Sequence, residues 1–231
     1  MKAIPSESFK ERVTTMNLNN EELRSAVIGM MLGDGCITKR YENGDAYFQM
    51  SHTEKQFDYM MFKKSILDNI TSSTIHQTEK VLNGKLFKGY HLGTRNHPFF
   101  TRLYSRFYHN GRKVVDEYIV KKINPLALAI WFMDDGCSGI NRRTDHENSV
   151  FYLCTQSFDY ANQLLLKKSL KINFGLDWNI NKAEVSSSGS YNYRLRLAQR
   201  HNDEFVNIIR QFLLPSIEYK LGSYANQLVT N

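Results

Sequence analysis

Two aspartates, Asp34 and Asp135, each precede a glycine and follow an apolar run, residues 27–33 and 128–134. The two carboxylates stand 101 residues apart. If both runs are buried helices that end side by side, the carboxylates meet in one place and repel each other. A divalent cation between them removes that repulsion, and Mg²⁺ takes one or two carboxylates together with phosphate oxygens. The pattern therefore predicts a metal site built from the two aspartates.

The alternative interpretation of an Asp-Gly pair is an ordinary solvated turn. One pair alone would favour that alternative, whereas two pairs in equal positions after two apolar runs favour the metal site. Asn124 and Pro125 match the N-cap and the first position of a helix, which supports the helical interpretation of the second run. Asn20 is the expected cap of the first helix.

Four glycines around the motifs also suggest how the helices pack and end. Gly29 and Gly33 lie four residues apart, so they share one helix face and permit the close approach of another backbone. Gly35 and Gly136 stand where a left-handed residue would end each helix. We therefore expect two tightly packed helices, each terminated by a left-handed glycine.

The composition restricts the class of protein. The 231 residues carry a net charge of +7 with a pI near 9.2, which favours a polyanionic partner. The apolar runs are too short to span a bilayer, and no signal peptide is recognisable, so residues 1–18 are expected to form an N-terminal arm. The three cysteines, Cys36, Cys137 and Cys154, contain no C-x-x-C pair, which favours a reducing compartment and argues against a structural metal site.

The chain repeats itself with a period near 100 residues, which indicates two related halves. Phe57-Asp58-Tyr59 recurs as Phe158-Asp159-Tyr160. We expect an arm at 1–18, a first half at 19–123 and a second half at 124–231. Each half should contain a motif helix, a polar loop (38–45, 138–148), a strand (46–51, 150–155), a helix (58–67, 159–170), two strands (74–81 and 86–94, 176–185 and 191–198) and a closing amphipathic helix.

The last two expected strands alternate between apolar and polar side chains, so their sheet should present one polar face. Arginine and asparagine are the side chains that pair bidentately with guanine and adenine edges. A solvated surface is the alternative for any one of them, but a row of them beside a metal site favours DNA contact. The candidate DNA-binding residues are Lys39, Arg40, Asn179, Asn181, Asn192, Arg194 and Arg196.

Several stretches resemble the LAGLIDADG homing endonucleases, in particular the single-chain branch with two motifs. The resemblance rests on the two motif aspartates and on residues 126–136 (LALAIWFMDDG), 155–158 (TQSF) and 214–221 (LPSIEYKL). It extends over residues 19–221. It implies an α+β fold of two pseudo-symmetric αββαββα halves, in which the motif helices form the interface and antiparallel sheets form a DNA-binding saddle.

The resemblance also implies an activity, which is metal-dependent hydrolysis of both strands of a long asymmetric DNA site. Mg²⁺ is the expected cofactor, Mn²⁺ is expected to substitute for it, and Ca²⁺ is expected to bind without supporting cleavage. The expected partner is double-stranded DNA, bound by a monomer without an obligate protein partner or a membrane. The expected context is an intron-encoded gene that promotes intron mobility, in a mitochondrion, a chloroplast or the bacterial cytoplasm.

Residue roles follow from the same resemblance. Asp34 and Asp135 match the catalytic, metal-binding acids, with Gly33 and Asp134 beside them at the metal site. Asp134 stands where a small residue is usual, so it either supports a ligand from behind or faces solvent.

A basic residue in each half is expected to polarise the nucleophilic water or the phosphate. Lys220, in Tyr-Lys-Leu, matches that position in the second half. Its first-half counterpart is Lys113, and the register leaves Arg112 open.

Other functions remain as alternatives. The first is an RNA maturase that assists splicing of its host intron, and the second is a DNA-binding regulator that does not cut. The intact pair Asp34 and Asp135 favours the nuclease over both, because binding alone does not need two carboxylates. An intein is disfavoured because the chain is too short to hold splicing blocks around this domain.

Overall fold

The computed structural model describes residues 18–141, 148–185 and 191–228. Most of the expected N-terminal arm and the segment 186–190 lie outside the described residues. The first half contains α2 (Asn20–Leu32), β1 (Cys36–Thr38), β2 (Tyr47–Thr53), α3 (Phe57–Leu67), β3 (Ser73–Leu82), β4 (Lys85–Thr94) and α4 (Pro98–Phe107). The second contains α6 (Pro125–Asp135), β7 (Gly136–Asn141), β8 (Asn148–Leu153), α7 (Tyr160–Phe174), β9 (Trp178–Val185), β10 (Tyr191–Leu197) and α8 (Asn202–Ile209). The expected α+β order, αββαββα in each half, is confirmed.

Short elements connect and close the two halves. A small hairpin, β5 (Tyr108–His109) and β6 (Arg112–Lys113), and a short helix, α5 (Glu117–Lys121), lead from α4 to α6. After α8 the chain continues in 3-10 turns over Arg210–Phe212 and Pro215–Leu228. The expected closing helix of the second half therefore ends at Ile209, where the chain passes into the first of these turns.

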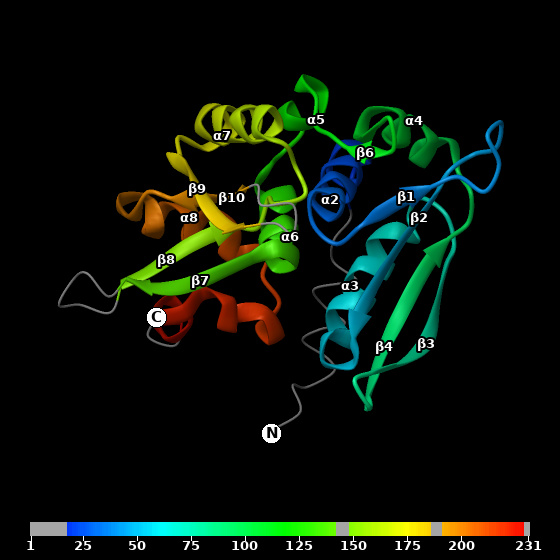
Figure 1. Cartoon of the computed structure of the whole chain (residues 1–231), viewed down its shortest axis with the longest axis horizontal. Coiled ribbons are helices and arrows are strands. Elements are labelled where there is room, and N and C mark those ends of the chain that lie inside the picture. The colour runs from blue at the N-terminus through cyan, green and yellow to red at the C-terminus, as the bar shows by residue number, and fades with distance from the viewer. Residues whose placement is uncertain (1–17, 142–147, 186–190, 229–231) are drawn as a thin grey trace.

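In the described part of the chain each half contributes one four-stranded antiparallel sheet. The strand order is β1-β2-β4-β3 in one sheet and β7-β8-β10-β9 in the other, so the two halves share one topology. Figure 1 shows α2 and α6 at the centre, with one sheet on either side. Helices cover one face of each sheet and leave the other face open.

The sequence prediction missed the outer strands β1 and β7: β7 occupies residues 138–141 of the loop expected at 138–148, whereas the loop expected at 38–45 is present from residue 39 onward. Cys36 pairs with Gln49 in the first sheet, and Cys137 pairs with Tyr152 in the second. Glycine and polar residues hide these strands in the sequence, since an edge strand is stabilised by its ladder to a neighbour and not by its own apolar pattern.

The same two pairs show that the structural register between the halves differs from the sequence repeat. Cys36 and Gln49 are 13 positions apart, whereas Cys137 and Tyr152 are 15 positions apart. The second hairpin is therefore two residues longer. The structural counterpart of a residue in β2 or α3 lies 103 positions further on, as the first helical residues Phe57 and Tyr160 also indicate.

The N-termini of the motif helices are capped by asparagine, as the sequence suggested, with one correction. Asn124 caps α6, and its side chain accepts a hydrogen bond from Ala127 N with Pro125 in the first turn. The cap of α2 is Asn19 and not Asn20, because the side chain of Glu22 returns to Asn19 N and completes a capping box.

The prediction of left-handed glycines after the motif helices was wrong. The left-handed glycines of the described chain are Gly84, Gly111, Gly175 and Gly222. Gly136 is extended, with φ −84° and ψ 150°, because the chain passes directly from α6 into β7. Glycine is needed at the motif for space: a Cβ on Gly35 would lie 2.6 Å from the carbonyl oxygen of Met30.

The apolar runs of both motif helices, residues 25–32 and 126–134, are buried on every side, as their sequences require. The side chains that pack around them come from both halves, so α2 and α6 form the common core. None of the helices in the described ranges combines the length and apolar character that crossing a membrane would take.

Candidate active site at the ends of the motif helices

The close approach of α2 and α6 places Asp34 and Asp135 at neighbouring helix ends. Gly29 faces Ala127, whose carbonyl oxygen would lie 2.5 Å from a Cβ on Gly29. One turn further on, Gly33 faces Asp134, and a Cβ on Gly33 would lie 2.6 Å from Asp134 Oδ2. The close helix contact expected from Gly29 and Gly33 is therefore present in the structure.

Both motif carboxylates are held in an environment that disfavours their charge. Burial is the first cause that raises the pKa of Asp34, and the neighbouring Asp134 carboxylate is the second. Burial, followed by the charge of Asp34, raises the pKa of Asp135 to about 7. Without a cation, the charged state of this pair is therefore costly.

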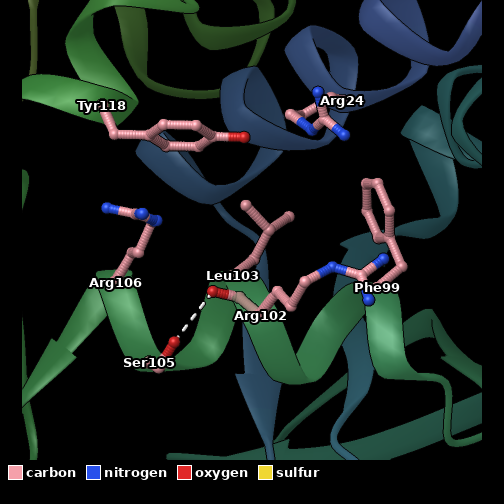
Figure 2. Close-up of a pocket in the computed structure, with 7 residues that line it drawn as sticks. All are labelled: Arg24, Phe99, Arg102, Leu103, Ser105, Arg106 and Tyr118. Carbon is pink, nitrogen blue, oxygen red and sulfur yellow. Dashed lines mark hydrogen bonds between the residues drawn. The ribbon is translucent and has the colours of Figure 1, made fainter.

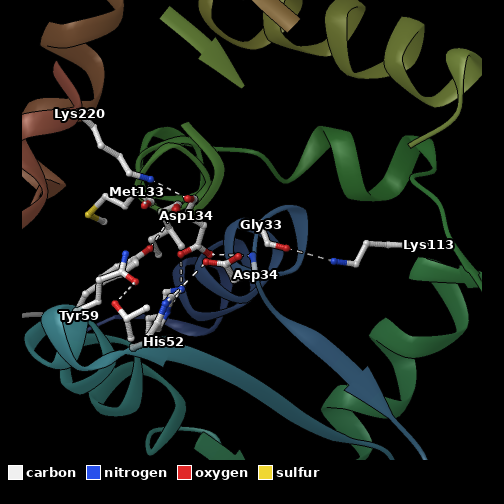
Figure 3. Close-up of polar contacts among 12 residues, drawn as sticks. Gly33, Asp34, His52, Tyr59, Lys113, Met133, Asp134 and Lys220 are labelled. Carbon is white, nitrogen blue, oxygen red and sulfur yellow. Dashed lines mark hydrogen bonds and ion pairs between the residues drawn. The ribbon is translucent and has the colours of Figure 1, made fainter. Parts of the chain in front are cut away.

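One lysine from each half binds the C-terminal end of a motif helix (Figure 3). Lys113 Nζ donates to Gly33 O at 3.3 Å and to Gly35 O at 3.0 Å. Lys220 Nζ donates to Met133 O and to Asp134 O, both at 2.7 Å. Burial lowers the pKa of each ammonium. The structure brings Lys113 to the site, whereas Arg112 is exposed.

Asp134 lies inside a polar cluster that joins the two halves. Its side chain is fully buried, so the solvent-facing alternative was wrong. Asp134 Oδ1 accepts from Lys63 Nζ, and Asp134 Oδ2 accepts from Asp34 N at 3.4 Å. Lys63 Nζ also lies 3.0 Å from His52 Nε2, and His52 Nδ1 faces Asp34 Oδ2 at 3.8 Å (Figure 3).

Sequence reasoning missed Lys63 and His52, although the sequence carries a signal for one of them. His52 alternates with Phe48 and Met50 along β2, so it points to the apolar side of the sheet, where an imidazole needs a polar partner. Lys63 carries no such signal in the sequence. Its burial is visible only once α3 packs against α6.

The geometry separates two places where a cation can be considered. Asp34, His52 and Asp134 offer ligand atoms within 4.8 Å of one another. However, the Lys63 ammonium already contacts His52 and Asp134 there, so a divalent ion would meet a buried positive charge. The second place is the solvent-facing side of Asp34 and Asp135, since both residues are partly exposed. Two carboxylates with raised pKa values fit a hard divalent ion in that place.

The raised pKa of Asp135 gives a test that needs no DNA. The folded state retains a proton that the unfolded state loses near pH 4, so stability should fall as pH rises from about 4 to 7. With a chelator present, we expect the melting temperature of Asp135→Asn to rise relative to that of the wild type as the pH increases from about 4 to 7. Mg²⁺ at pH 7.5 should stabilise the wild type and not the variant. Calorimetry measures the melting temperature of both proteins against pH. Parallel curves for the wild type and the variant would contradict this assignment.

The open face of the second sheet carries most of the candidate DNA-binding residues. Arg194 pairs with Asn181 and Arg196 pairs with Asn179, so these four side chains share one face. Their neighbours Trp178, Leu195 and Leu197 are buried on the other face. The remaining residue of the set, Asn192, lies where the register of β10 shifts.

The two first-half candidates lie apart from this row. Arg40 lies over the ring of Tyr47, next to the open face of the first sheet. Lys39 Nζ bonds to Glu42 O at 3.1 Å and lies near the ring of Tyr104 on α4, so it extends toward the helices. Sequence reasoning also missed Ser51 and His91, a cross-strand pair on the open face joined by a hydrogen bond of 3.0 Å.

A separate basic hollow of about 270 Å³ lies beside the N-terminal part of α2 (Figure 2). Arg24 is paired with Glu21 there, and Arg106 is paired with Asp116 and stacks over Tyr118. The Arg102 guanidinium has no hydrogen bond or ion pair among the described residues, although its backbone carbonyl accepts from Ser105 Oγ. Arg24 and Asp34 are ten residues apart along α2 and its C-terminal end, about 15 Å at a rise of 1.5 Å per residue, so this hollow is distinct from the candidate active site.

Comparison with known proteins gives a family match. The profile of the LAGLIDADG DNA endonuclease family matches residues 24–205. Protein RecA of Mycolicibacterium chitae is 29% identical over 84% of this chain and 45% of its own length. This chain spans less than half of that relative. The cytochrome b mRNA maturase bI2 of Debaryomyces hansenii is 27% identical over 93% of this chain and 80% of its own length. The DNA endonuclease I-ChuI of Chlamydomonas applanata is 23% identical over 90% of this chain and 97% of its own length.

Solved structures match the fold along most of the chain. The homing endonuclease I-WcaI bound to its DNA recognition sequence aligns with a TM-score of 0.75 and 22% identity, over 95% of this chain and 94% of that one. I-DmoI in complex with DNA and Mn aligns with a TM-score of 0.51 and 14% identity, over 85% of this chain and 100% of that one. These likenesses confirm the fold.

Proposed function

Because its family profile covers most of the sequence, this chain belongs to the LAGLIDADG DNA endonuclease family, and on that premise we propose that it is a site-specific homing endonuclease. It hydrolyses both strands of a long asymmetric DNA duplex in a metal-dependent reaction. The observation that carries the proposal is the pair Asp34 and Asp135 at adjacent helix ends, each with a lysine on the carbonyl oxygen before it. The gene is intron-encoded in this proposal, in an organelle or a bacterium, and its product promotes intron mobility.

Asp34 and Asp135 are proposed to hold Mg²⁺ on their solvent-facing side, with Gly33 and Asp134 directly behind them. When bound there, the metal would supply an activated water and stabilisation for the leaving 3′-oxygen of each strand. Lys113 and Lys220 hold the main chain that carries the two acids. Their ammonium groups lie beside the carboxylates, where they polarise a water or a phosphate oxygen of the bound strand.

We propose the open faces of the two sheets as the DNA-binding surface. Arginines that neutralise phosphates release counterions, so binding should weaken linearly on a log–log plot against salt, with a slope of about −0.9 per phosphate contact. Replacing Arg194 or Arg196 with alanine should make the slope shallower by up to about 0.9, the value of one phosphate contact. Anisotropy titrations at several salt concentrations measure this. An unchanged slope in both variants would exclude these side chains from phosphate contact.

We further propose that one molecule acts on one site. A single-motif protein must dimerise to bring two acids together, whereas this chain carries both motifs in its halves, 19–123 and 124–231, after an arm at 1–18. The differing sheet faces of the halves support an asymmetric target. Light scattering of the cutting complex should give one protein chain per duplex, and a complex of two chains as the sole cutting species would refute it.

An RNA maturase is the second candidate. The basic hollow of Arg24, Arg102 and Arg106 supports it, because an RNA bound there would leave the sheets free. The likeness to the cytochrome b mRNA maturase bI2 also supports it. The two functions separate at one residue, since splicing assistance should survive Asp34→Asn and DNA cleavage should not.

Cleavage of a randomised DNA library tests the main proposal. The full chain is incubated with the library in Mg²⁺, Mn²⁺ or Ca²⁺, and the product ends are sequenced. We expect one extended consensus cut on both strands in Mg²⁺ and Mn²⁺, and binding without cutting in Ca²⁺. Random ends, or no product in any metal, would contradict a site-specific endonuclease.

A further inference from the structure

His52 faces charged groups on two sides of its ring. Lys63 Nζ lies 3.0 Å from Nε2, and Asp34 Oδ2 lies 3.8 Å from Nδ1. Gln56 raises the pKa of His52, and the more distant Lys220 contributes a second positive charge that lowers it. The His52 side chain is almost fully buried, so these protein groups and not bulk water decide where the ring carries its proton.

These neighbours select one neutral form of the imidazole. A lysine ammonium has only donors, so Nε2 must accept from Lys63 and carry no proton of its own. Burial and the charge of Lys63 lower the pKa of His52 to about 4, which agrees with a neutral ring at physiological pH. The single ring proton therefore lies on Nδ1, on the side of the Asp34 carboxylate. Lys63 is itself held in place by Asp134 from the other half.

Among the described residues of the second half, no counterpart of this arrangement is found. By the register of the strands and helices, the position equivalent to His52 is Thr155, and the position equivalent to Lys63 is Leu166. The Thr155 hydroxyl donates to Gln163 Oε1 at 3.0 Å, and Leu166 is fully buried. Neither residue supplies an imidazole or a cation to Asp135. The two motif aspartates therefore have different support.

We propose that His52 is a positioning residue for Asp34: in the tautomer imposed by Lys63 it presents Nδ1–H to Oδ2 and leaves Oδ1 for the metal. This inference rests on the proposed function. At 3.8 Å the contact is electrostatic and longer than a hydrogen bond. Partners that orient a ligand from behind typically change activity by about 10–100-fold. Because Asp34 alone has such a partner among the described residues, the two DNA strands depend on His52 unequally.

Strand-resolved kinetics test this inequality. The two 5′ ends of one duplex carry different fluorophores, and the first-order rate for each strand is measured for the wild type, His52→Leu and His52→Asn. His52→Leu keeps the Lys63–Asp134 pair and removes the ring proton, so we expect one strand to slow by about 10–100-fold. The other strand should stay within about twofold. His52→Asn returns an N–H near Nδ1 and should restore the wild-type ratio.

The matched control is Thr155→Val at the equivalent position of the second half, which should leave the ratio of the strand rates unchanged. A purely structural role of His52 would slow both strands together and leave the ratio unchanged in His52→Leu, which would overturn the proposal. If Thr155→Val shifted the ratio as much as His52→Leu, the claimed asymmetry would also be wrong.

Long-range ¹H–¹⁵N correlation spectra of the full chain report the tautomer without any cleavage. The His52 signals, identified by their loss in His52→Leu, should show the proton on Nδ1. In Lys63→Met combined with Asp134→Ala, which removes the buried pair together and so protects the fold, this preference should be lost. A proton on Nε2 in the wild type would overturn the proposal even if DNA is cut. A wild type that cuts no DNA would refute the proposed function and leave the tautomer result standing.

Discussion

Replacing either motif aspartate with asparagine is expected to slow double-strand cleavage by more than about 100-fold, because even groups that only orient metal ligands are worth about 10–100-fold. Asparagine keeps the size of the side chain and removes the charge that a divalent ion needs. The pKa of each carboxylate is raised by burial and by a neighbouring carboxylate, so neutralising one should not harm the fold. Duplex affinity without metal should be equal to or above that of the wild type.

The control for this pair is Glu117→Gln, which removes an exposed carboxylate from a surface ion pair with Lys121 and should leave cleavage unchanged. Cleavage rates are read on supercoiled and linear DNA, with anisotropy for affinity and calorimetry for the fold. Either aspartate variant cutting both strands at the wild-type rate would remove that residue from the proposed metal site.

The elements that carry the candidate site were predictable from the sequence because local chemistry and burial agree there. Asn124 and Pro125 begin α6 as expected, and the apolar runs are buried on every side. Two Asp-Gly pairs at the ends of two buried helices leave little freedom in where the carboxylates lie. The spacing of Gly29 and Gly33 similarly predicted the face through which the helices meet.

The rest depends on contacts between the halves, which local patterns do not encode. Lys63 resembles any helical surface lysine in sequence, and its burial follows from the presence of Asp134 on the opposing helix. The Phe-Asp-Tyr repeat suggested an equal register in both halves, whereas a longer hairpin displaces the second half by two residues. Gly35 was interpreted through its conformational freedom, although its contact with the Met30 carbonyl oxygen is the actual constraint.

Gly29→Ala is expected to lower the melting temperature by roughly 6–12 °C, which corresponds to about 3 kcal/mol in a chain of this size. The new Cβ would lie 2.5 Å from Ala127 O and 2.9 Å from Ala127 Cα, so backbone meets backbone. Side-chain rearrangement cannot relieve such a contact, and the two helices must move apart. Since displacements near 1 Å can cost about 100-fold in rate, cleavage should fall even at temperatures where the variant is folded.

A second substitution distinguishes this explanation from ordinary overpacking. Ala127→Gly removes only a Cβ, so it should fail to rescue Gly29→Ala and should itself cost about 1 kcal/mol through helix propensity. Gly44→Ala serves as the control, because its Cβ would meet Tyr41 O at 3.4 Å on an exposed loop and should change little. Calorimetry on the wild type, the three single variants and the double variant decides the matter. Rescue of Gly29→Ala by Ala127→Gly would place the clash in side chains. The motif helices would then not meet through their backbones, and the close helix contact would not explain the fixed positions of the two aspartates.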